Sequence, residues 1–419
     1  MAGSVRIDKN HNEMTNKRIK NNRKTKMESK PITAEDRNVK EVSEVEKIAK
    51  FYGFLPINPP TIQKEDVQYT KEFDQSSYPA EKAALLRMYF EDKLMSKPQP
   101  NMFYCERPFP GSKELTGEIK KSSKVEGSLI SLGSGKNACE CLSIQTAIAI
   151  LKHLGYKNLE VEINSIGDKD SANEFQKNLN IFVRKNMNSF PPNIRQAVKK
   201  DLFKVLKEQP AGWEKFEAEC PKSIDFLSEP SRKHFKEILE FLEILDIPYQ
   251  INHNLVGDSD IGSETIFAIK GNLTANNKPE ELAYGFRFNR LAKKMGHRKG
   301  LLCNVLTISA KLKKKLKKVK TREVKPQFYL VQFGPEAKLK SFLVLEELYK
   351  AGVNIIHAIA KDKLSGQILT AEKSGAPYII LLGQKEALEN SVVIRDTNTR
   401  HQETVSISNI ATKVKELTK

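Results

Sequence analysis

The stretch KLSGQILTAEKSGAPYIILLGQKEALENSVVIRDTNTRHQE, residues 363–403, carries the pattern that decides the fold of the C-terminal part of the chain. Two short runs rich in β-branched residues, APYIILLGQ and SVVIRDT, follow a helical segment. Upstream, the runs QFYLVQFG and VNIIHAIAK enclose a second helical segment, EAKLKSFLVLEELYKAG. Strands that alternate with helices predict a small α/β domain with a mainly parallel sheet over residues 326–419.

The middle of the chain is predicted to contain both long helices and strands. ACECLSIQTAIAILKHLGY reads as a long apolar helix, and NLEVEINSIGD as an alternating strand over 159–163. Residues 171–245 are mostly helical in pattern. Their last helix, PSRKHFKEILEFLEIL, is amphipathic, with Phe235, Ile238, Leu239 and Leu242 on one face.

Composition places the chain among globular intracellular proteins. Its 419 residues allow two or three domains, and no apolar run approaches the ~18 residues that a membrane span needs. The N-terminus lacks the apolar core of a signal peptide, so we expect a cytoplasmic protein. The five cysteines are odd in number and scattered, which favours small buried residues in a reducing compartment over disulfides.

The net charge of +18 favours a polyanionic partner, with nucleic acid the first choice; solvated surface lysines are the alternative. Residues 1–40 are predicted to form a disordered basic arm. This arm either binds phosphates without specificity or serves only as a solubilising tail. Residues 311–325, KLKKKLKKVKTREVK, are predicted to form a basic linker helix, because Leu312, Leu316 and Val319 give it an apolar stripe. That helix faces nucleic acid through Lys313, Lys314 and Lys317, or has a solvated outer face.

Familiar catalytic motifs are absent from the sequence. GSLISLGSGKN resembles a phosphate-binding loop, but Ile130 and Asn137 stand where a Walker A motif needs glycine and a hydroxyl residue. The histidines show no metal-ligand spacing, so no metal is expected.

Several segments together resemble the histidyl-tRNA synthetase family. They are YGFLPINPP, INSIGD, the stretch from Cys220 to Val256, and the C-terminal pattern quoted above. The resemblance implies an α+β class II synthetase-like core over residues 41–310, an antiparallel sheet with flanking helices and a helical insertion at about 170–245. It also implies that residues 326–419 form an α/β anticodon-binding domain. Such a core activates histidine with ATP and transfers it to tRNA.

The segments that carry this chemistry in the family depart from its pattern here. In MFYCERPFPGSKEL, one register puts Tyr104 where the family has its motif 2 arginine, and the other puts Pro110–Ser112 there with Glu114 near the acidic position. Neither register supplies an arginine. The family's RPEGT is YPAEK in this chain, where Pro79 remains.

The family's histidine loop and its motif 3 also differ. In LVGDSDIGSETIFA, Gly257 replaces the catalytic arginine, and Asp260 is left without its partners. Arg287 stays in register. In NVLTISAKL, Lys311 replaces the motif 3 arginine, and Ile308 replaces a glycine, so Ile308 is expected to fill the adenine space. We therefore regard Ser112, Glu114, Gly257, Asp260, Arg287 and Lys311 as degenerate positions of a catalytic site.

The resemblance favours a non-catalytic paralogue that binds tRNA or another structured RNA, with no cofactor and a possible homodimer. A divergent active histidine–tRNA ligase, using ATP and Mg²⁺, is the first alternative, and a regulatory subunit of a metabolic enzyme is the second. The RNA contacts expected in the C-terminal domain are Lys361, Lys363, Gln367, Lys373, Glu386 and Arg395.

Overall fold

A computed structural model of the chain describes residues 39–69, 78–111, 124–133, 137–209, 212–257, 261–274, 278–297, 300–312, 318–322, 325–361 and 363–418. Residues 1–38 of the predicted N-terminal arm therefore lie outside the described residues. The same holds for Ser112, Glu114, Asp260, Lys313, Lys314 and Lys317.

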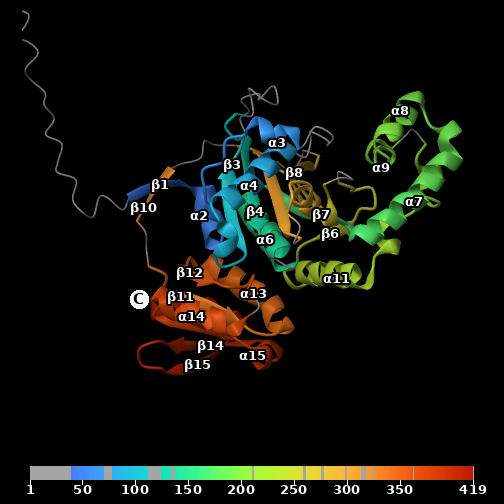
Figure 1. Cartoon of the computed structure of the whole chain (residues 1–419). Helices are drawn as coiled ribbons and strands as arrows, with labels where there is room; N and C mark the ends of the chain where they lie inside the picture. Colours follow the sequence, from blue (N-terminus) through green and yellow to red (C-terminus); the bar gives the residue numbers. More distant parts are fainter. Residues whose placement is uncertain are drawn as a thin grey trace, which may run out of the picture. The chain divides into compact units, whose positions relative to one another are not determined.

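The core is built on an eight-stranded sheet of the described residues (Figure 1). Its five inner pairings are antiparallel, which confirms the expected sheet, whereas the two edge strands pair in parallel. In spatial order the strands are β2 (Leu55–Pro56), β3 (Asn101–Glu106), β4 (Lys124–Leu132), β9 (Cys303–Lys311), β8 (Glu280–Arg287), β7 (Ser263–Asn272), β5 (Lys157–Gly167) and β6 (Tyr249–Ile251).

Helices cover both faces of this sheet. On one face, α6 (Asn137–His153) packs against β4 and β9, with α2 (Glu44–Phe51) and α11 (Glu229–Ile244) on α6. On the other face, α4 (Pro79–Glu91) and α12 (Asn289–Lys294) enclose a second apolar cluster that includes Leu86 and Leu291. Each strand of the centre is therefore buried on both sides. The short elements α3 (Lys64–Gln68) and η4 (Leu94–Ser96) lie beside α4.

A helical segment connects β5 to β6 and contains its own apolar cluster around Phe175, Phe203 and Trp213. The amphipathic face predicted for α11 is confirmed, because Phe235, Ile238 and Leu242 are buried and Leu239 is partly buried against the same core cluster. The other elements of the segment are α7 (Lys169–Asn186), η5 (Met187–Ser189), α8 (Pro192–Lys200), α9 (Lys204–Glu208), α10 (Glu214–Glu217) and η6 (Ser223–Phe226).

The C-terminal domain contains a five-stranded sheet in the order β12 (Ile355–His357), β11 (Phe328–Gln332), β13 (Tyr378–Leu382), β14 (Ser391–Asp396) and β15 (Gln402–Ser406). The prediction of a mainly parallel sheet is only half right. β12, β11 and β13 are parallel, but β14 is antiparallel to β13. A tight turn at Asp396–Arg400 then reverses the chain, so β15 is antiparallel to β14. The helices are α13 (Pro335–Ala351), α14 (Leu364–Ser374), α15 (Gln384–Leu388), η7 (Ile407–Asn409) and α16 (Ile410–Leu417).

The C-terminal domain shares its apolar core with the larger sheet. Phe342 on α13 packs edge-to-face against Phe241 on α11, with ring centroids 4.8 Å apart. The Gln145 side chain on α6 donates a hydrogen bond to the Phe342 carbonyl at 3.1 Å. One continuous cluster of buried residues includes both Leu151 and Leu345.

The expected linker helix over residues 311–325 is wrong where the structure describes it. β9 runs through Lys311, and residues Lys318–Arg322 form strand β10, which pairs with β1 (Val39–Ser43). The β-branched residues Val319 and Thr321 alternate with basic residues, and this period of two suits a strand.

All five cysteines are free and buried, as their scatter predicted. Among the described residues, no helix combines the length and apolarity needed to cross a membrane.

Candidate functional site

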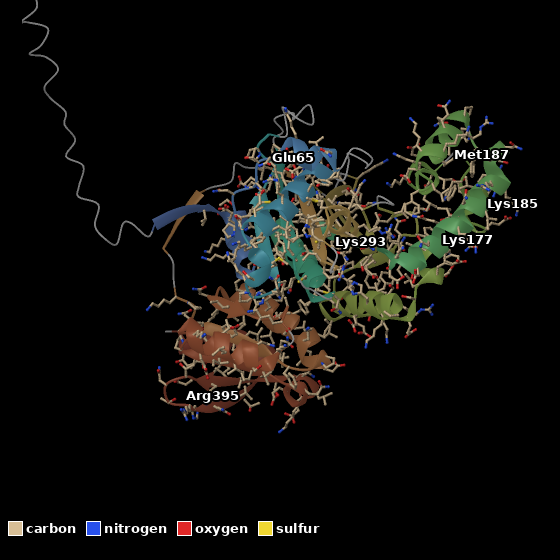
Figure 2. All side chains as sticks on the ribbon, viewed as in Figure 1. Glu65, Lys177, Lys185, Met187, Lys293 and Arg395 are labelled. Atoms are coloured by element: carbon tan, nitrogen blue, oxygen red, sulfur yellow. The ribbon has the colours of Figure 1, made fainter. Side chains whose placement is uncertain are left out.

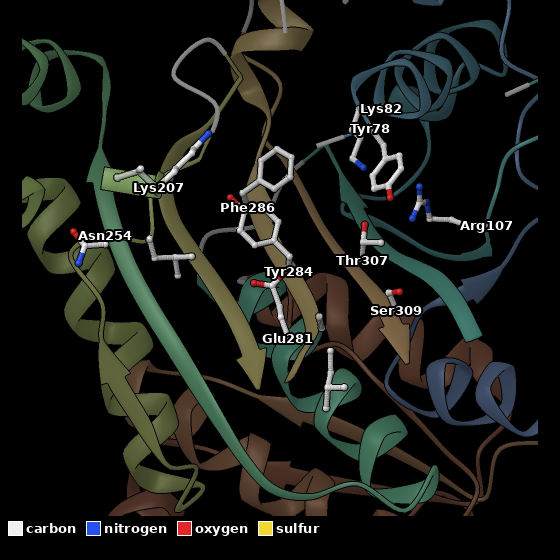
Figure 3. Close-up of a pocket in the computed structure, with 14 residues that line it drawn as sticks. Tyr78, Lys82, Arg107, Lys207, Asn254, Glu281, Tyr284, Phe286, Thr307 and Ser309 are labelled. Atoms are coloured by element: carbon white, nitrogen blue, oxygen red, sulfur yellow. The ribbon is translucent and has the colours of Figure 1, made fainter. Parts of the chain in front are cut away.

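A cavity of about 440 Å³ opens on the face of the central sheet that carries α4 (Figure 3). That volume falls within the ~300–1,000 Å³ of small-molecule sites. Its base is formed by β8 and β9, through Tyr284, Phe286, Thr307 and Ser309. The other lining residues are Tyr78, Lys82, Arg107, Lys207, Asn254, Leu255, Val256, Glu281, Leu282 and Ala283.

The expectation that Ile308 blocks this cavity is wrong. Successive side chains of a strand point to opposite faces, and Thr307 and Ser309 face the cavity. Ile308 therefore faces the other side of the sheet, where it is 1% exposed within the core cluster that contains α6. A β-branched residue suits this position because it packs against a helix.

Arg107 and Glu81 form a buried ion pair at one end of the cavity. Arg107 follows β3, and its Nε and Nη2 donate hydrogen bonds to the two carboxylate oxygens of Glu81, at 2.6 and 3.1 Å. The guanidinium also lies 3.7 Å from the ring centroid of Tyr78. Arg107 is thus held by a carboxylate and an aromatic ring at once, which fixes its orientation.

Lys82, on the first turn of α4, is the second cation at this end. It is 2% exposed, and its Nζ lies 5.5 Å from the Tyr78 ring centroid (Figure 3). The pKa of Lys82 is lowered to about 8, chiefly by burial; the Glu81 charge opposes this shift, and the Arg107 charge adds a smaller lowering effect. Within the described part of the chain, its ammonium group makes no hydrogen bond or ion pair.

Gly257 is buried close to the cavity. A Cβ built on Gly257 would lie 3.7 Å from the hydroxyl of Tyr284 and 3.2 Å from Cδ1 of Ile266. The position where the family resemblance expects an arginine is therefore next to the cavity, and it contributes no side chain.

Arg287 and Lys311 lie away from the cavity. Arg287 is 5% exposed and donates hydrogen bonds from Nε and Nη2 to Glu140 on α6, at 3.0 and 2.6 Å. His234 of α11 approaches the same carboxylate at 2.9 Å. Lys311, at the end of β9, pairs with Glu280 at 2.8 Å and is solvent-exposed. Arg287 thus belongs to a buried ionic cluster of the core.

The residues expected to contact RNA divide into two groups. Gln367 is fully buried, accepts a hydrogen bond from the Gln332 N–H and donates to the Gln332 carbonyl, so its assignment as an RNA contact is wrong. Glu386 accepts a hydrogen bond from the Gly383 N–H and caps α15. Lys363 and Lys373 are exposed, and Lys361 and Arg395 are partly exposed; Figure 2 shows Arg395 on the outer strands of the domain.

Reasoning from sequence missed Glu81, Lys82 and Arg107. YPAEK was compared with the family's letters, so Glu81 and Lys82 were counted as losses. The signal that could have identified them is the charge pattern: an acidic and a basic residue open an apolar helix, and an arginine follows a buried strand.

The chain is similar to several known proteins. Residues 327–417 match the family model described as anticodon binding domain. The chain is 26% identical over 333 residues to the histidine–tRNA ligase of Bacillus velezensis, covering 78% of each chain. It is 24% identical to the histidine–tRNA ligase of Pelotomaculum thermopropionicum, covering 89% of this chain and 92% of the relative. The crystal structure of apo S. aureus histidyl-tRNA synthetase aligns with a TM-score of 0.49 at 19% identity, over 88% of this chain and 93% of that one.

The sheet with its flanking helices and the anticodon-binding domain define a class II aminoacyl-tRNA synthetase-like protein. Within that class, the chain is similar in sequence to histidine–tRNA ligases over most of its length.

Proposed function

We propose that this protein is a non-catalytic member of its family that binds tRNA or another structured RNA. The observation that carries the proposal is Gly257, which lies beside the cavity without a side chain at the position where the family pattern has a catalytic arginine. Amino-acid activation by ATP concentrates negative charge on the α-phosphate, and the loss of one such charge partner typically costs ~10²–10³ in rate.

Among the described residues, the arginines and the lysine at or near the family's catalytic positions are bonded to other partners, which does not fit the ATP and Mg²⁺ that activation requires. The guanidinium of Arg107 is already bonded to Glu81 and stacked on Tyr78, so it is not available to a triphosphate without breaking a buried pair. Arg287 is bonded to Glu140 in the core, and Lys311 to Glu280. No catalytic step is therefore assigned.

RNA binding is supported by the C-terminal domain and by the distribution of charge. Residues 1–40 contain 11 basic and 5 acidic residues, and residues 311–325 contain 9 and 1, so these two segments supply +14 of the net +18. Basic segments bind phosphates without sequence preference, and the domain that matches an anticodon-binding model is the element that selects the RNA. We also propose that the protein is cytoplasmic. We propose further that it forms a homodimer, and analytical ultracentrifugation would test this oligomeric state.

The decisive experiment is ATP–pyrophosphate exchange with histidine and Mg²⁺, with the Bacillus velezensis ligase as positive control. We expect no exchange above background from this chain, together with binding of a histidine tRNA transcript in an electrophoretic mobility shift. Exchange at a rate comparable to the control would establish the active-ligase alternative. Failure to bind the transcript or a duplex RNA hairpin at low salt would defeat the RNA-binding half of the proposal.

A further inference from the structure

The cavity contains a cation whose charge the described protein does not neutralise. Lys82 is 2% exposed and lines the cavity. Among the described residues, Glu81 is the carboxylate beside it, and Glu81 is bonded to Arg107 through both of its oxygens. A buried ammonium without a partner is strongly unfavourable, so it loses its proton or takes up an anion.

The backbone around Lys82 also favours an anion. Tyr78 and Lys82 belong to the N-terminal turn of α4, a 13-residue helix, and Tyr78 makes no side-chain capping hydrogen bond. The positive end of the helix dipole and its uncapped N–H groups therefore add to the Lys82 charge. Tyr78 has φ of +49°, in the left-handed region that non-glycine residues rarely adopt, and such strain is often found where ligands bind.

The other walls define what surrounds the anionic group. Leu255, Leu282 and Phe286 supply apolar surface, and Thr307 and Ser309 supply hydroxyl groups on the base. The charged groups that face Lys82 are Glu81 and Arg107 on its own side; Glu281 and Lys207 line the rest of the cavity. Burial raises the pKa of the neighbouring Cys105 thiol to about 12, so this group is neutral.

We propose that the cavity binds a small molecule through a carboxylate or phosphate group that pairs with the Lys82 ammonium, while an apolar portion rests on Leu282 and Phe286. The residue is a departure from the family pattern, in which a threonine occupies this place in RPEGT. The inference goes beyond RNA binding and stands independently of it. The cavity is then a ligand site with a new specificity, separate from the anticodon-binding domain.

Isothermal titration of the full-length protein with sodium benzoate and with inorganic phosphate, at constant ionic strength, tests the proposal. Benzoate stands for a ligand that carries a carboxylate on an apolar ring, and inorganic phosphate stands for a ligand that carries a phosphate group. Tight binding of one of the two anions at pH 7 identifies which group, carboxylate or phosphate, the cavity recognises. Lys82→Met is expected to weaken that binding at least tenfold, whereas Lys293→Met, which removes an exposed charge on α12, leaves it unchanged.

A measurement on the unaltered protein covers the case in which Lys82→Met does not fold. Benzoate stays ionised across the range, so its affinity is expected to fall about tenfold or more between pH 7 and pH 9.5 as Lys82 loses its proton. Equal binding to wild type and Lys82→Met, a flat pH profile, or no binding of either anion would overturn the proposal. RNA binding and pyrophosphate exchange are read separately, so failure here leaves the proposed function intact.

Discussion

Glu81 and Arg107 are joined by two hydrogen bonds, although Glu81 lies at the start of α4 and Arg107 lies directly after β3. Their side chains are 5% and 3% exposed, so neither charge has water to replace its partner. This pair fixes α4 against the sheet and thereby sets the position of Lys82, the next residue along the helix.

Glu81→Gln is expected to lower the free energy of unfolding by about 3–5 kcal/mol, because it leaves the buried guanidinium of Arg107 without a counter-charge. Glu91→Gln is the control, because Glu91 is an exposed carboxylate of the same helix that pairs with Arg87. This variant is expected to lower the free energy of unfolding by at most about 1 kcal/mol. Urea denaturation of the two variants makes the comparison. Similar losses in both would mean that burial of the Glu81–Arg107 pair is unimportant.

Lys82→Met is expected to stabilise the protein at neutral pH. The folded-state pKa of Lys82 lies near 8 against 10.5 for the unconstrained side chain, so the charged form is disfavoured in the fold. This cost is fully present below pH 8, and stability rises between pH 8 and about pH 10.5 as the unfolded state retains the extra proton. The shift corresponds to about 3 kcal/mol. Thermal denaturation from pH 7 to 10.5 should show the rise in wild type and not in the variant.

Acid should destabilise the core through Glu140. Burial pushes the pKa of Glu140 upward, but the charges of Arg287 and then His234 outweigh it and lower the pKa to about 2. A carboxyl with a depressed pKa stabilises the fold above its unfolded value of about 4.5, and this contribution disappears as the pH falls towards 2. Glu140→Gln should therefore lower stability at pH 7 by about 3 kcal/mol and flatten the acid limb. An unchanged acid limb would contradict this origin.

Single alanine replacements of Lys361, Lys363 and Lys373 are expected to weaken RNA binding, and each should reduce the slope of log affinity against log salt by about 1. Lys177→Ala is a matched control, because Figure 2 places this exposed lysine on α7 rather than on the C-terminal domain. Fluorescence anisotropy with a labelled tRNA transcript measures both quantities. An equal loss from Lys177→Ala would indicate non-specific attraction.

Gln367→Ala separates stability from RNA contact. The side-chain amide of Gln367 makes buried hydrogen bonds to two backbone groups of Gln332 and a partly buried one to the carbonyl of Lys361. Its removal is expected to cost about 1–3 kcal/mol per buried group left unsatisfied. Affinity for RNA, measured well below the melting temperature, should remain within twofold of wild type.

The outline of the fold follows from residue patterns that depend on neighbours in the chain. The face of α11 was predictable because Phe235, Ile238 and Leu242 recur at helical spacing and bury together. β10 was mistaken for a helix because Leu312, Leu316 and Val319 suggested an apolar stripe, whereas the pairing with β1 depends on a partner nearly 280 residues away. Long-range pairing is not visible in local periodicity.

The site was less predictable, since it depends on which way side chains face. Ile308 lies between the polar residues Thr307 and Ser309, and this alternation indicates that it faces the opposite side of the sheet from them. The prediction compared Ile308 with a family glycine instead and so placed it in the cavity. Lys82 could be assigned to the cavity only after α4 had been docked, because burial of a lysine in the first turn of a helix has no signature in sequence.

The C-terminal domain shares with the core the apolar cluster that contains Phe241 and Phe342, so its folding depends on the core. Cutting the chain before residue 325 would expose the α13 surface that carries Phe342 and Leu345, and an excised fragment would tend to self-associate. Truncation is therefore a poor way to map function in this protein, and full-length point variants are the sound choice. The core must therefore remain folded to support the C-terminal domain, whatever chemistry it carries.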